Sequence, residues 1–467
     1  MPEKFDIAVI GSGPGGYAAA IRCAQRGASV VIAEKDLIGG TCLNRGCVPS
    51  KSLLASAHAF LSIKQAAAMG VDVASAHPNW PKIQARKEAI VTGFRKGLAG
   101  LIQSNKIKTF RGRGVVTAPH KIKVETDSPP TEIHADKIIL ATGSEPAQIA
   151  AIPFDRQTVL SSKEALDLQQ IPESMLIIGG GVIGCEFACL YAALGTKVTI
   201  VEALSRLVPM EDEWVGRLIA REFQKLGINV LTDQKVTSVD KQNGAAGVVL
   251  ESGQTINVEK ALIAVGRRPA CDKETTEGLN LEMSGSAIKV NEKLQTSAPG
   301  VYAIGDAIGT TYLAHGAFAE ARVAAVNATG GDEKIGDYCL IPRAVYTFPE
   351  IASVGKNEQA CRSEGLEVSV GRAFFKANAR SAAYNETAGE VRVVRDNRTT
   401  EILGVIMVGP TATELIAAAR ALIGSTEMIS DISFPHPTVS EVLKEAGEDA
   451  FGLSLHNPPK TQETTTA

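Results

Sequence analysis

One sequence pattern occurs twice in this chain of 467 residues. Ile7-Ala-Val-Ile-Gly-Ser-Gly-Pro-Gly-Gly16 and Leu176-Ile-Ile-Gly-Gly-Gly-Val-Ile-Gly184 each lead from an apolar run into a Gly-x-Gly-x-x-Gly turn. In both copies an acidic residue, Glu34 or Glu202, follows the first glycine by 23 positions and ends a second apolar run. A strand, a glycine-rich turn, a helix and a second strand form a βαβ unit. The repeat therefore predicts an α/β fold with two Rossmann-like dinucleotide-binding domains.

The residue types in these fingerprints suit a dinucleotide. A pyrophosphate must approach backbone N–H groups at a helix N-terminus, where a Cβ would obstruct it, and the acid accepts hydrogen bonds from ribose hydroxyls. Glu202 is followed by Ala203-Leu-Ser rather than by a cluster of arginines, which favours NAD at the second site. Arg206 lies close enough that binding of the 2′-phosphorylated form, NADP, stays an alternative. We expect the binding residues to be Gly11, Gly13, Gly16 and Glu34 in the first copy, and Gly179, Gly181, Gly184 and Glu202 in the second.

Two cysteines, Cys42 and Cys47, lie in Gly-Gly-Thr-Cys-Leu-Asn-Arg-Gly-Cys-Val-Pro-Ser-Lys51, shortly after the first fingerprint. Residues five apart on a regular helix are too distant for a disulfide, so a bridge needs distorted backbone, which the neighbouring glycines permit. Pro49 favours a kink or a new helix start, whose N-terminal partial charge stabilises a thiolate at Cys47. The pattern favours a labile, redox-active bridge, with a structural disulfide or half of a metal site as alternatives.

A histidine held between two prolines forms a second candidate centre, in Phe434-Pro-His-Pro-Thr-Val-Ser-Glu441. Residues before proline are held extended, so His436 has a stiff backbone, and the peptide bond before Pro437 is a candidate for the cis form. A histidine with a carboxylate partner removes protons from thiols. Glu441 is either that partner or, with Thr438, part of a Thr-x-x-Glu capping box.

The bulk composition excludes several classes of protein. The net charge is −3 and no basic block occurs, which argues against nucleic-acid binding. Eight scattered cysteines are too few for a secreted disulfide scaffold, and no stretch of 18 apolar residues predicts a membrane span. A strand begins almost at the first residue, so we expect no targeting segment and a cytoplasmic location, or the plastid stroma for a mature form.

The order of predicted elements suggests four domains and a tail. Helices are expected at 51–69 and 80–105, a run rich in β-structure at 109–124, and a strand that ends in glycine within 137–144. From about residue 341 the pattern changes to strands at 343–347, 368–375, 389–395 and 402–408 with a helix at 413–423, an α+β module suited to oligomerisation. The predicted boundaries are 1–145 for the first dinucleotide-binding domain, 146–267 for the second, 268–340 for a central domain, 341–455 for an interface domain and 456–467 for a disordered tail.

Taken together, the cysteine segment, both fingerprints, Ala141-Thr-Gly143, Gly305-Asp306, Leu313-Ala-His315, Tyr346-Thr-Phe-Pro-Glu350 and His436-Pro-Thr-x-x-Glu441 give a family resemblance over residues 5 to about 453. The chain resembles the FAD-dependent pyridine nucleotide–disulfide oxidoreductases. Within that family it is similar to the members that oxidise dihydrolipoamide, and Asn-Arg-Gly between the cysteines is similar to their plastid and cyanobacterial branch.

The resemblance implies a homodimer with FAD and NAD in each subunit. It further implies a redox disulfide between Cys42 and Cys47, a base at His436 oriented by Glu441 and supplied by the other subunit, and a Lys51–Glu186 pair near the flavin. Asp306 also ends a buried strand, where α/β folds place ligands, with a helix cap as its alternative role. Further cofactor contacts implied by the resemblance are Lys35, Gly40, Thr41, Lys51, Gly114, Thr142, Gly143, Ser144, Val182, Ile183, Val236, Gly266, Leu313, Ala314 and His315.

The implied reaction is the oxidation of protein-bound dihydrolipoamide by NAD⁺. The implied partners are a lipoyl-bearing acyltransferase of a 2-oxo acid dehydrogenase, such as pyruvate dehydrogenase, or the glycine-cleavage carrier protein. Rivals are glutathione reductase and mercuric reductase, and a non-catalytic flavoprotein redox sensor from another class. Two positions depart from the family pattern: Arg45, which either adds positive charge beside the cysteines or points to solvent, and Phe434, where relatives often carry a second histidine.

Overall fold

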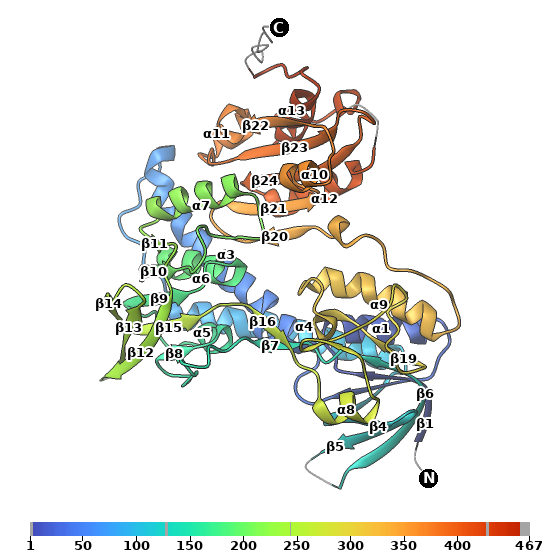
Figure 1. Ribbon diagram of the computed structural model, residues 1–467. Coiled ribbons are helices and arrows are strands. Elements are labelled where there is room, and N and C mark those ends of the chain that lie inside the picture. The colour runs from blue at the N-terminus through green and yellow to red at the C-terminus, as the bar shows by residue number, and fades with distance from the viewer. Residues whose placement is uncertain (1–2, 127–128, 243, 426–428, 458–467) are drawn as a thin grey trace. The chain divides into compact units, whose positions relative to one another are not determined.

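The structure, a computed structural model, describes residues 3–126, 129–242, 244–425 and 429–457. Its chain forms two compact units, each assembled from separate stretches of sequence (Figure 1). The first unit takes residues 1–56, 78–171 and 262–338, and the second takes 57–77, 172–261 and 339–467. The predicted tail lies mostly outside the described residues, and the four-domain boundaries stay a prediction.

The first unit is built on one mixed sheet with the strand order β3-β2-β1-β6-β5-β4. Strands β1, β2 and β3 run parallel, β6 joins them in parallel, and β19 pairs with the C-terminal half of β6. The second half of β1, Ile7–Ile10, and the whole of β2 are buried, which accounts for their continuous apolar runs. The bounds are β1 (Glu3–Ile10), β2 (Val30–Glu34), β3 (Lys108–Arg111), β4 (Arg113–Ala118), β5 (Lys121–Glu125), β6 (Thr131–Leu140) and β19 (Val301–Ala303).

Helices α1 and α9 pack against each other beside this sheet and share its hydrophobic core (Figure 1). Helix α3 begins in this unit and continues past its boundary at residue 56. The helices are α1 (Pro14–Gln25), α2 (Gly40–Arg45), α3 (Cys47–Gln65), α4 (Trp80–Ser104), α5 (Ser162–Leu166), α8 (Lys273–Gly278), η2 (Gly305–Ile308) and α9 (Ala314–Ala328). Short strands complete the unit: β7 (Ser144–Pro146), β8 (Val159–Leu160), β16 (Arg267–Pro269), β17 (Met283–Ser284) and β18 (Ala287–Ile288).

The second unit begins with the other βαβ repeat. Strands β9, β10 and β11 are parallel, and three antiparallel strands, β12, β13 and β14, form a separate sheet. The bounds are β9 (Ser174–Ile178), α6 (Val182–Ala193), β10 (Lys197–Val201), α7 (Glu213–Lys225), β11 (Asn229–Leu231), β12 (Val236–Gln242), β13 (Ala245–Leu250) and β14 (Thr255–Val258), and β15 (Lys260–Ile263) spans the boundary between the units. The 3-10 turn η1 (Ala66–Met69) also belongs to this unit.

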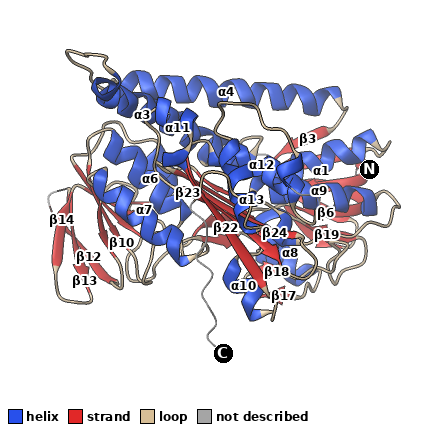
Figure 2. Cartoon of the chain, turned by 90° about the horizontal axis from the view of Figure 1, so that it is seen from above, coloured by secondary structure: helices blue, strands red, loops and turns tan. Residues whose placement is uncertain are grey.

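The C-terminal module is an antiparallel sheet with the order β20-β21-β24-β23-β22, against which α12 and α13 pack (Figure 2). The bounds are η3 (Tyr338–Leu340), β20 (Arg343–Val345), β21 (Glu350–Gly355), α10 (Glu358–Ser363), β22 (Val368–Phe374), η4 (Phe375–Ala377), α11 (Ala379–Ala383), β23 (Glu390–Asp396), β24 (Ile402–Gly409), α12 (Ala412–Leu422), η5 (Ile429–Asp431) and α13 (Glu441–Ala450). The four expected strands and the expected helix are confirmed, and β21 is an additional central strand.

Within the described ranges, none of the helices combines the length and the apolar character that crossing a membrane requires.

Candidate active site

The first fingerprint joins β1 to α1 by a turn that only glycine fits. Gly11 has φ +97°, and a Cβ there would lie 2.3 Å from the carbonyl oxygen of Ala141. A Cβ on Gly16 would lie 2.0 Å from the carbonyl oxygen of Gly11. Both contacts are far inside van der Waals distance, so these glycines hold the helix close to the strands.

The start of α1 is open and the acid is fixed. A Cβ on Gly13, the N-cap residue, would have no atom within 4 Å, and no side chain caps the helix. The buried Glu34 carboxylate accepts hydrogen bonds from the Ser12 N–H and the Ser12 hydroxyl, each at 2.7 Å, and from the Asp36 N–H at 2.9 Å. An open helix N-terminus beside an anchored carboxylate fits a dinucleotide.

The second fingerprint repeats this geometry between β9 and α6. Gly179 has φ +108°, a Cβ on Gly184 would lie 2.0 Å from the Gly179 carbonyl oxygen, and a Cβ on Gly181 would have no atom within 4 Å. The buried Glu202 carboxylate accepts the N–H groups of Gly180 at 2.6 Å and Leu204 at 2.8 Å. Val182 and Ile183 open α6, and Val236 begins β12.

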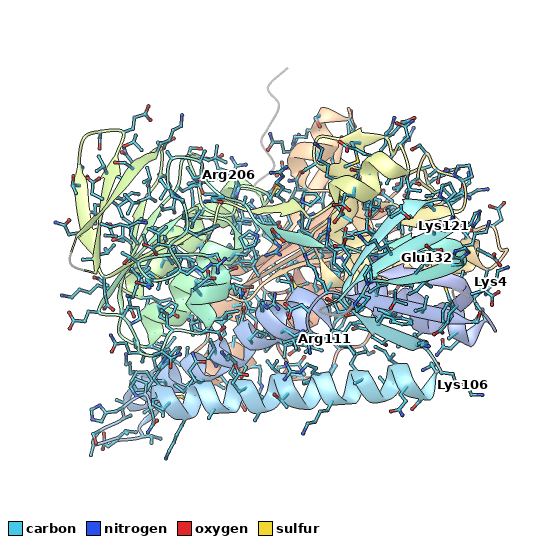
Figure 3. All side chains as sticks on the ribbon, turned by 90° about the horizontal axis from the view of Figure 1, so that it is seen from below. Lys4, Lys106, Arg111, Lys121, Glu132 and Arg206 are labelled. Atoms are coloured by element: carbon cyan, nitrogen blue, oxygen red, sulfur yellow. The ribbon has the colours of Figure 1, made fainter. Side chains whose placement is uncertain are left out.

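Arg206, labelled in Figure 3, donates from Nη2 to the carbonyl oxygen of Pro209 at 3.2 Å. This contact holds part of the guanidinium within its own loop. The acid at Glu202 therefore remains the feature that favours NAD over its 2′-phosphorylated form.

The cysteine segment starts directly against the first fingerprint. The Gly39 N–H donates to the Ser12 carbonyl oxygen at 3.1 Å, and a Cβ on Gly40 would lie 2.7 Å from the Gly13 Cα. Gly40 and Thr41 then begin α2, which carries Cys42. The fingerprint contacts thus set the position of the segment that carries the predicted redox pair.

Cys42 and Cys47 lie together at the break between α2 and α3. Gly46 interrupts the helical path with φ −143° and ψ −111°. Both cysteines are free thiols in the structure, and the disulfide between them stays a prediction. A hydrogen bond to Cys47, burial and the charge of Cys47 raise the pKa of the Cys42 thiol strongly, and Lys51 acts in the opposite direction.

Three further side chains near the cysteine segment are Tyr17, Arg45 and Lys51. Burial raises the pKa of Tyr17 on α1, and the charges of Cys42 and Cys47 raise it further. Arg45 forms an ion pair with Asp36, so its guanidinium neither points freely to solvent nor acts as an uncompensated charge. Lys51 is the cation that lowers the pKa of Cys42.

A polar cluster forms where the β6 and β19 segments end. The Ser144 hydroxyl donates to the Asp306 carboxylate and accepts from Arg267 Nε at 2.7 Å, while Arg267 Nη2 donates to the Ser144 carbonyl oxygen at 2.7 Å. Sequence reasoning missed Arg267. The sequence indicated it only through its position next to Gly266, a predicted cofactor contact. In the structure, Arg267 lies on a strand that pairs with Ser144–Pro146. Burial lowers the pKa of Arg267, and the charges of Asp306 and Cys47 oppose this shift.

The structure places the remaining predicted contacts of the first unit in four settings. Gly143, with φ +75°, accepts the Ala270 N–H at 2.9 Å, and Thr142 precedes it. Leu313 is the N-cap of α9, followed by Ala314 and His315. Gly114 packs against the core, since a Cβ there would lie 2.8 Å from the Ala33 Cβ, and Lys35 forms a surface ion pair with Glu145 at 3.7 Å.

His436 and Glu441 form the predicted pair in the second unit. The two side chains meet at 2.9 Å between His436 Nδ1 and Glu441 Oε1, and the peptide bond before Pro437 is cis, as expected. Glu441 Oε2 also accepts the Thr438 N–H at 2.8 Å, which is half of the predicted capping box. The box itself is not formed, because α13 begins at Glu441 with Ser440 as its N-cap and without a side-chain cap bond. Burial raises the pKa of the Glu441 carboxyl, but the bonds from Thr438 and His436 outweigh it and leave the pKa lowered.

The predicted residues therefore fall into two groups. The first unit carries one fingerprint, the dithiol, Lys51 and the Ser144–Asp306 cluster, and the second carries the other fingerprint, Glu186 and the His436–Glu441 pair. Glu186 is buried, and its Oε1 accepts the Tyr346 N–H at 3.1 Å. The Lys51–Glu186 pairing joins residues of different units and stays a prediction. Phe434 packs against the core of the C-terminal module.

Comparison with known proteins places this arrangement in a family. The family model for pyridine nucleotide-disulphide oxidoreductases matches residues 5–321, and the model for the dimerisation domain of these enzymes matches residues 341–447. The chain belongs to this family. As a pyridine nucleotide–disulphide oxidoreductase it is a flavoprotein that uses FAD and NAD(H).

Relatives of this oxidoreductase extend over its whole length. A dihydrolipoyl dehydrogenase from Bacillus subtilis is 40% identical, covering 96% of this chain and 99% of its own. A dihydrolipoyl dehydrogenase from Thermus scotoductus is 39% identical, covering 97% and 99%. The crystal structure of LpdA from Mycobacterium tuberculosis superposes with a TM-score of 0.89 at 26% identity, covering 96% and 99%.

Among the described residues, no group of three or more histidine, cysteine, aspartate and glutamate side chains is arranged to hold a metal ion.

Proposed function

We propose that this oxidoreductase is a dihydrolipoyl dehydrogenase, which oxidises protein-bound dihydrolipoamide to lipoamide and reduces NAD⁺ to NADH. The observation that carries the proposal is the Cys42–Cys47 dithiol seated against the first dinucleotide fingerprint. The second is the His436–Glu441 pair, because a thiol substrate needs a base. Full-length relatives at 35–40% identity carry this enzyme name.

The two fingerprints divide the cofactors between them in this proposal. The open N-terminus of α1 and Glu34 would hold the pyrophosphate and ribose of FAD, and the N-terminus of α6 and Glu202 would hold those of NAD. Asp306, Ser144 and the start of α9 would hold the remainder of FAD. When bound, FAD would supply the two-electron chemistry that links the cysteine dithiol to NAD⁺.

Thiol–disulfide exchange accounts for the first half of the reaction. His436 takes a proton from one substrate thiol, and the resulting thiolate attacks Cys42 Sγ while the Cys42–Cys47 bond breaks. The second substrate sulfur then displaces Cys42 and closes lipoamide. Two electrons and two protons leave dihydrolipoamide, and two thiols form on the protein. Lys51 favours the thiolate on the cysteine pair, and Cys47 is the member directed to the flavin.

The proposed working form is a homodimer in which His436 of one subunit serves the cysteines of the other. The dimerisation-domain match supports this form. The proposed domains are those predicted from the sequence, with the interface domain at 341–455. The proposed partner is a lipoyl-bearing acyltransferase or the glycine-cleavage carrier protein, and the proposed location is the cytoplasm or, as a mature form, the plastid stroma.

The test is a comparison of substrates on the purified holoenzyme. We expect turnover of dihydrolipoamide with NAD⁺ to exceed turnover with NADP⁺, and no comparable reduction of glutathione disulfide by NADPH. Preference for glutathione disulfide would overturn the assignment. Oxidation of a lipoylated acyltransferase domain and of a lipoylated carrier protein, measured under the same conditions, distinguishes the two partners.

A further inference from the structure

Glu320 is a fully buried carboxylate that none of the sequence motifs includes. It lies on α9 with 0% of its surface exposed, and it receives three hydrogen bonds. Oε2 accepts the Gly305 N–H at 2.6 Å, and Oε1 accepts the Thr310 hydroxyl at 3.0 Å and the Tyr338 hydroxyl at 3.1 Å. A buried charged group with this many donors is an ordered anchor for the segments that supply them.

The most constrained of these segments is the turn that carries Asp306. The Ile304 N–H still donates to the Leu140 carbonyl oxygen at 3.0 Å, and Gly305 then turns out of the sheet with φ +67°. The Gly305 N–H has left the strand ladder and needs another acceptor, because an unpaired buried N–H costs free energy. Glu320 supplies that acceptor. The turn also lies close to α9, since a Cβ on Gly305 would be 3.5 Å from the Cβ of Ala317, one turn before Glu320.

The side chain of Asp306 is held by different groups. Ser144 donates to its carboxylate, and Arg267 lies 3.8 Å from it. Glu320 therefore fixes the main chain of the turn, while Ser144 and Arg267 orient the carboxylate. Burial raises the pKa of Glu320 and the negative charge of Asp306 adds to this, whereas the three hydrogen bonds act against it.

We propose that Glu320 is a positioning residue for FAD: its hydrogen bond to the Gly305 N–H sets the turn that presents the Asp306 carboxylate to the cofactor. Its bonds to Thr310 and Tyr338 keep the Glu320 carboxylate itself in place. The inference rests on the assignment of FAD to the first fingerprint and of Asp306 to its binding. It does not depend on the identity of the disulfide substrate.

The test measures the rate at which FAD leaves the purified holoenzyme, followed by flavin fluorescence after dilution. Glu320→Leu is apolar and removes the acceptor of the Gly305 N–H and of the Thr310 and Tyr338 hydroxyls, so the turn loses its anchor and we expect FAD to leave at least about tenfold faster. Glu320→Gln retains a carbonyl oxygen for the Gly305 N–H, and both hydroxyls are able to accept from its amide. We expect this conservative variant to stay within about threefold of the wild-type rate.

Asn327 provides a matched control on the same helix. It is 7% exposed and also makes three hydrogen bonds, donating to the carbonyl oxygens of Lys293 and Glu333 and accepting the Glu333 N–H. Asn327→Leu removes these bonds two turns away from Glu320, so it reports general loss of stability. We expect a lowered unfolding temperature but FAD release within about twofold of the wild type.

The outcomes separate positioning from a purely structural role. The proposal is wrong if Glu320→Leu and Asn327→Leu release FAD at the same rate when their unfolding temperatures are lowered equally. It is also wrong if Glu320→Gln releases FAD as fast as Glu320→Leu. If Glu320→Leu does not fold, Glu320→Asp serves, since it keeps the charge but withdraws the carboxylate by one carbon, and an unchanged release rate there contradicts the proposal. A wild-type enzyme that binds FAD but does not oxidise dihydrolipoamide would refute the proposed function alone.

Discussion

At the scale of single residues, the two cysteines can be tested one at a time. The hydrogen bond to Cys47 and burial raise the pKa of the Cys42 thiol. We expect Cys47→Ser to retain FAD, because the fingerprint contacts do not involve its side chain, and to lose turnover of dihydrolipoamide. Flavin absorbance of the purified variant and a steady-state assay measure the two properties. Loss of FAD together with activity would show that Cys47 has a structural role instead.

His436 offers a second prediction at this scale, with an internal control. The pair of His456 Nδ1 and Glu445 Oε1 at 2.7 Å resembles that of His436 and Glu441 in distance, and the two histidine side chains are 70% and 72% exposed. We expect His436→Gln to slow dihydrolipoamide oxidation about 10²–10⁴-fold, the usual contribution of a general base. Reduction of the flavin by NADH, followed by stopped-flow absorbance, stays near the wild-type rate.

His456→Gln should leave both measurements unchanged, because its pair lies outside the Pro-His-Pro segment. Near-normal dihydrolipoamide turnover in His436→Gln would remove the histidine from the mechanism. Equal losses in the two variants would attribute the effect to general disturbance of the C-terminal module.

At the scale of elements, the two fingerprints are predicted to be separable. A Cβ at Gly13 or Gly181 meets no atom within 4 Å, so alanine fits the fold but blocks the approach of a pyrophosphate to the helix N-terminus. We expect Gly13→Ala to lower the FAD content, and Gly181→Ala to keep FAD but raise the KM for NAD⁺. Gly97→Ala on α4, also unobstructed and exposed, is the control and should be neutral or slightly stabilising. Identical effects of the first two variants would contradict separate sites.

The elements that sequence analysis predicted are those with a local signal. Glycines at fixed spacing marked β1, α1, β9 and α6, and the Pro-His-Pro stiffness marked the loop before α13. Strand β21 escaped because Ile351, Ala352, Ser353 and Val354 are all buried in the middle of a sheet, so polar and apolar residues do not alternate. The sequence did not predict Arg267, because its partner Ser144 is distant along the chain. It did not predict Glu320 either, because the partner is the backbone N–H of Gly305, a residue without a side chain.

At the scale of the whole molecule, the decisive prediction concerns where the base comes from. If His436 serves the cysteines of the other subunit, a mixed dimer of Cys47→Ser and His436→Gln chains combines both defects in one site and leaves the other site intact. Random assembly makes half of the dimers mixed, each with one working site, so the co-expressed mixture should recover about a quarter of the wild-type activity per chain and purified heterodimers about half. Cys47→Ser alone stays inactive, and His436→Gln alone keeps only its residual rate. The measurement is dihydrolipoamide oxidation by doubly tagged, purified heterodimers, with a Cys42→Ser and Cys47→Ser mixture as the control that cannot complement. Inactive heterodimers would mean that both groups act within a single chain, and the dimer would then serve stability rather than catalysis.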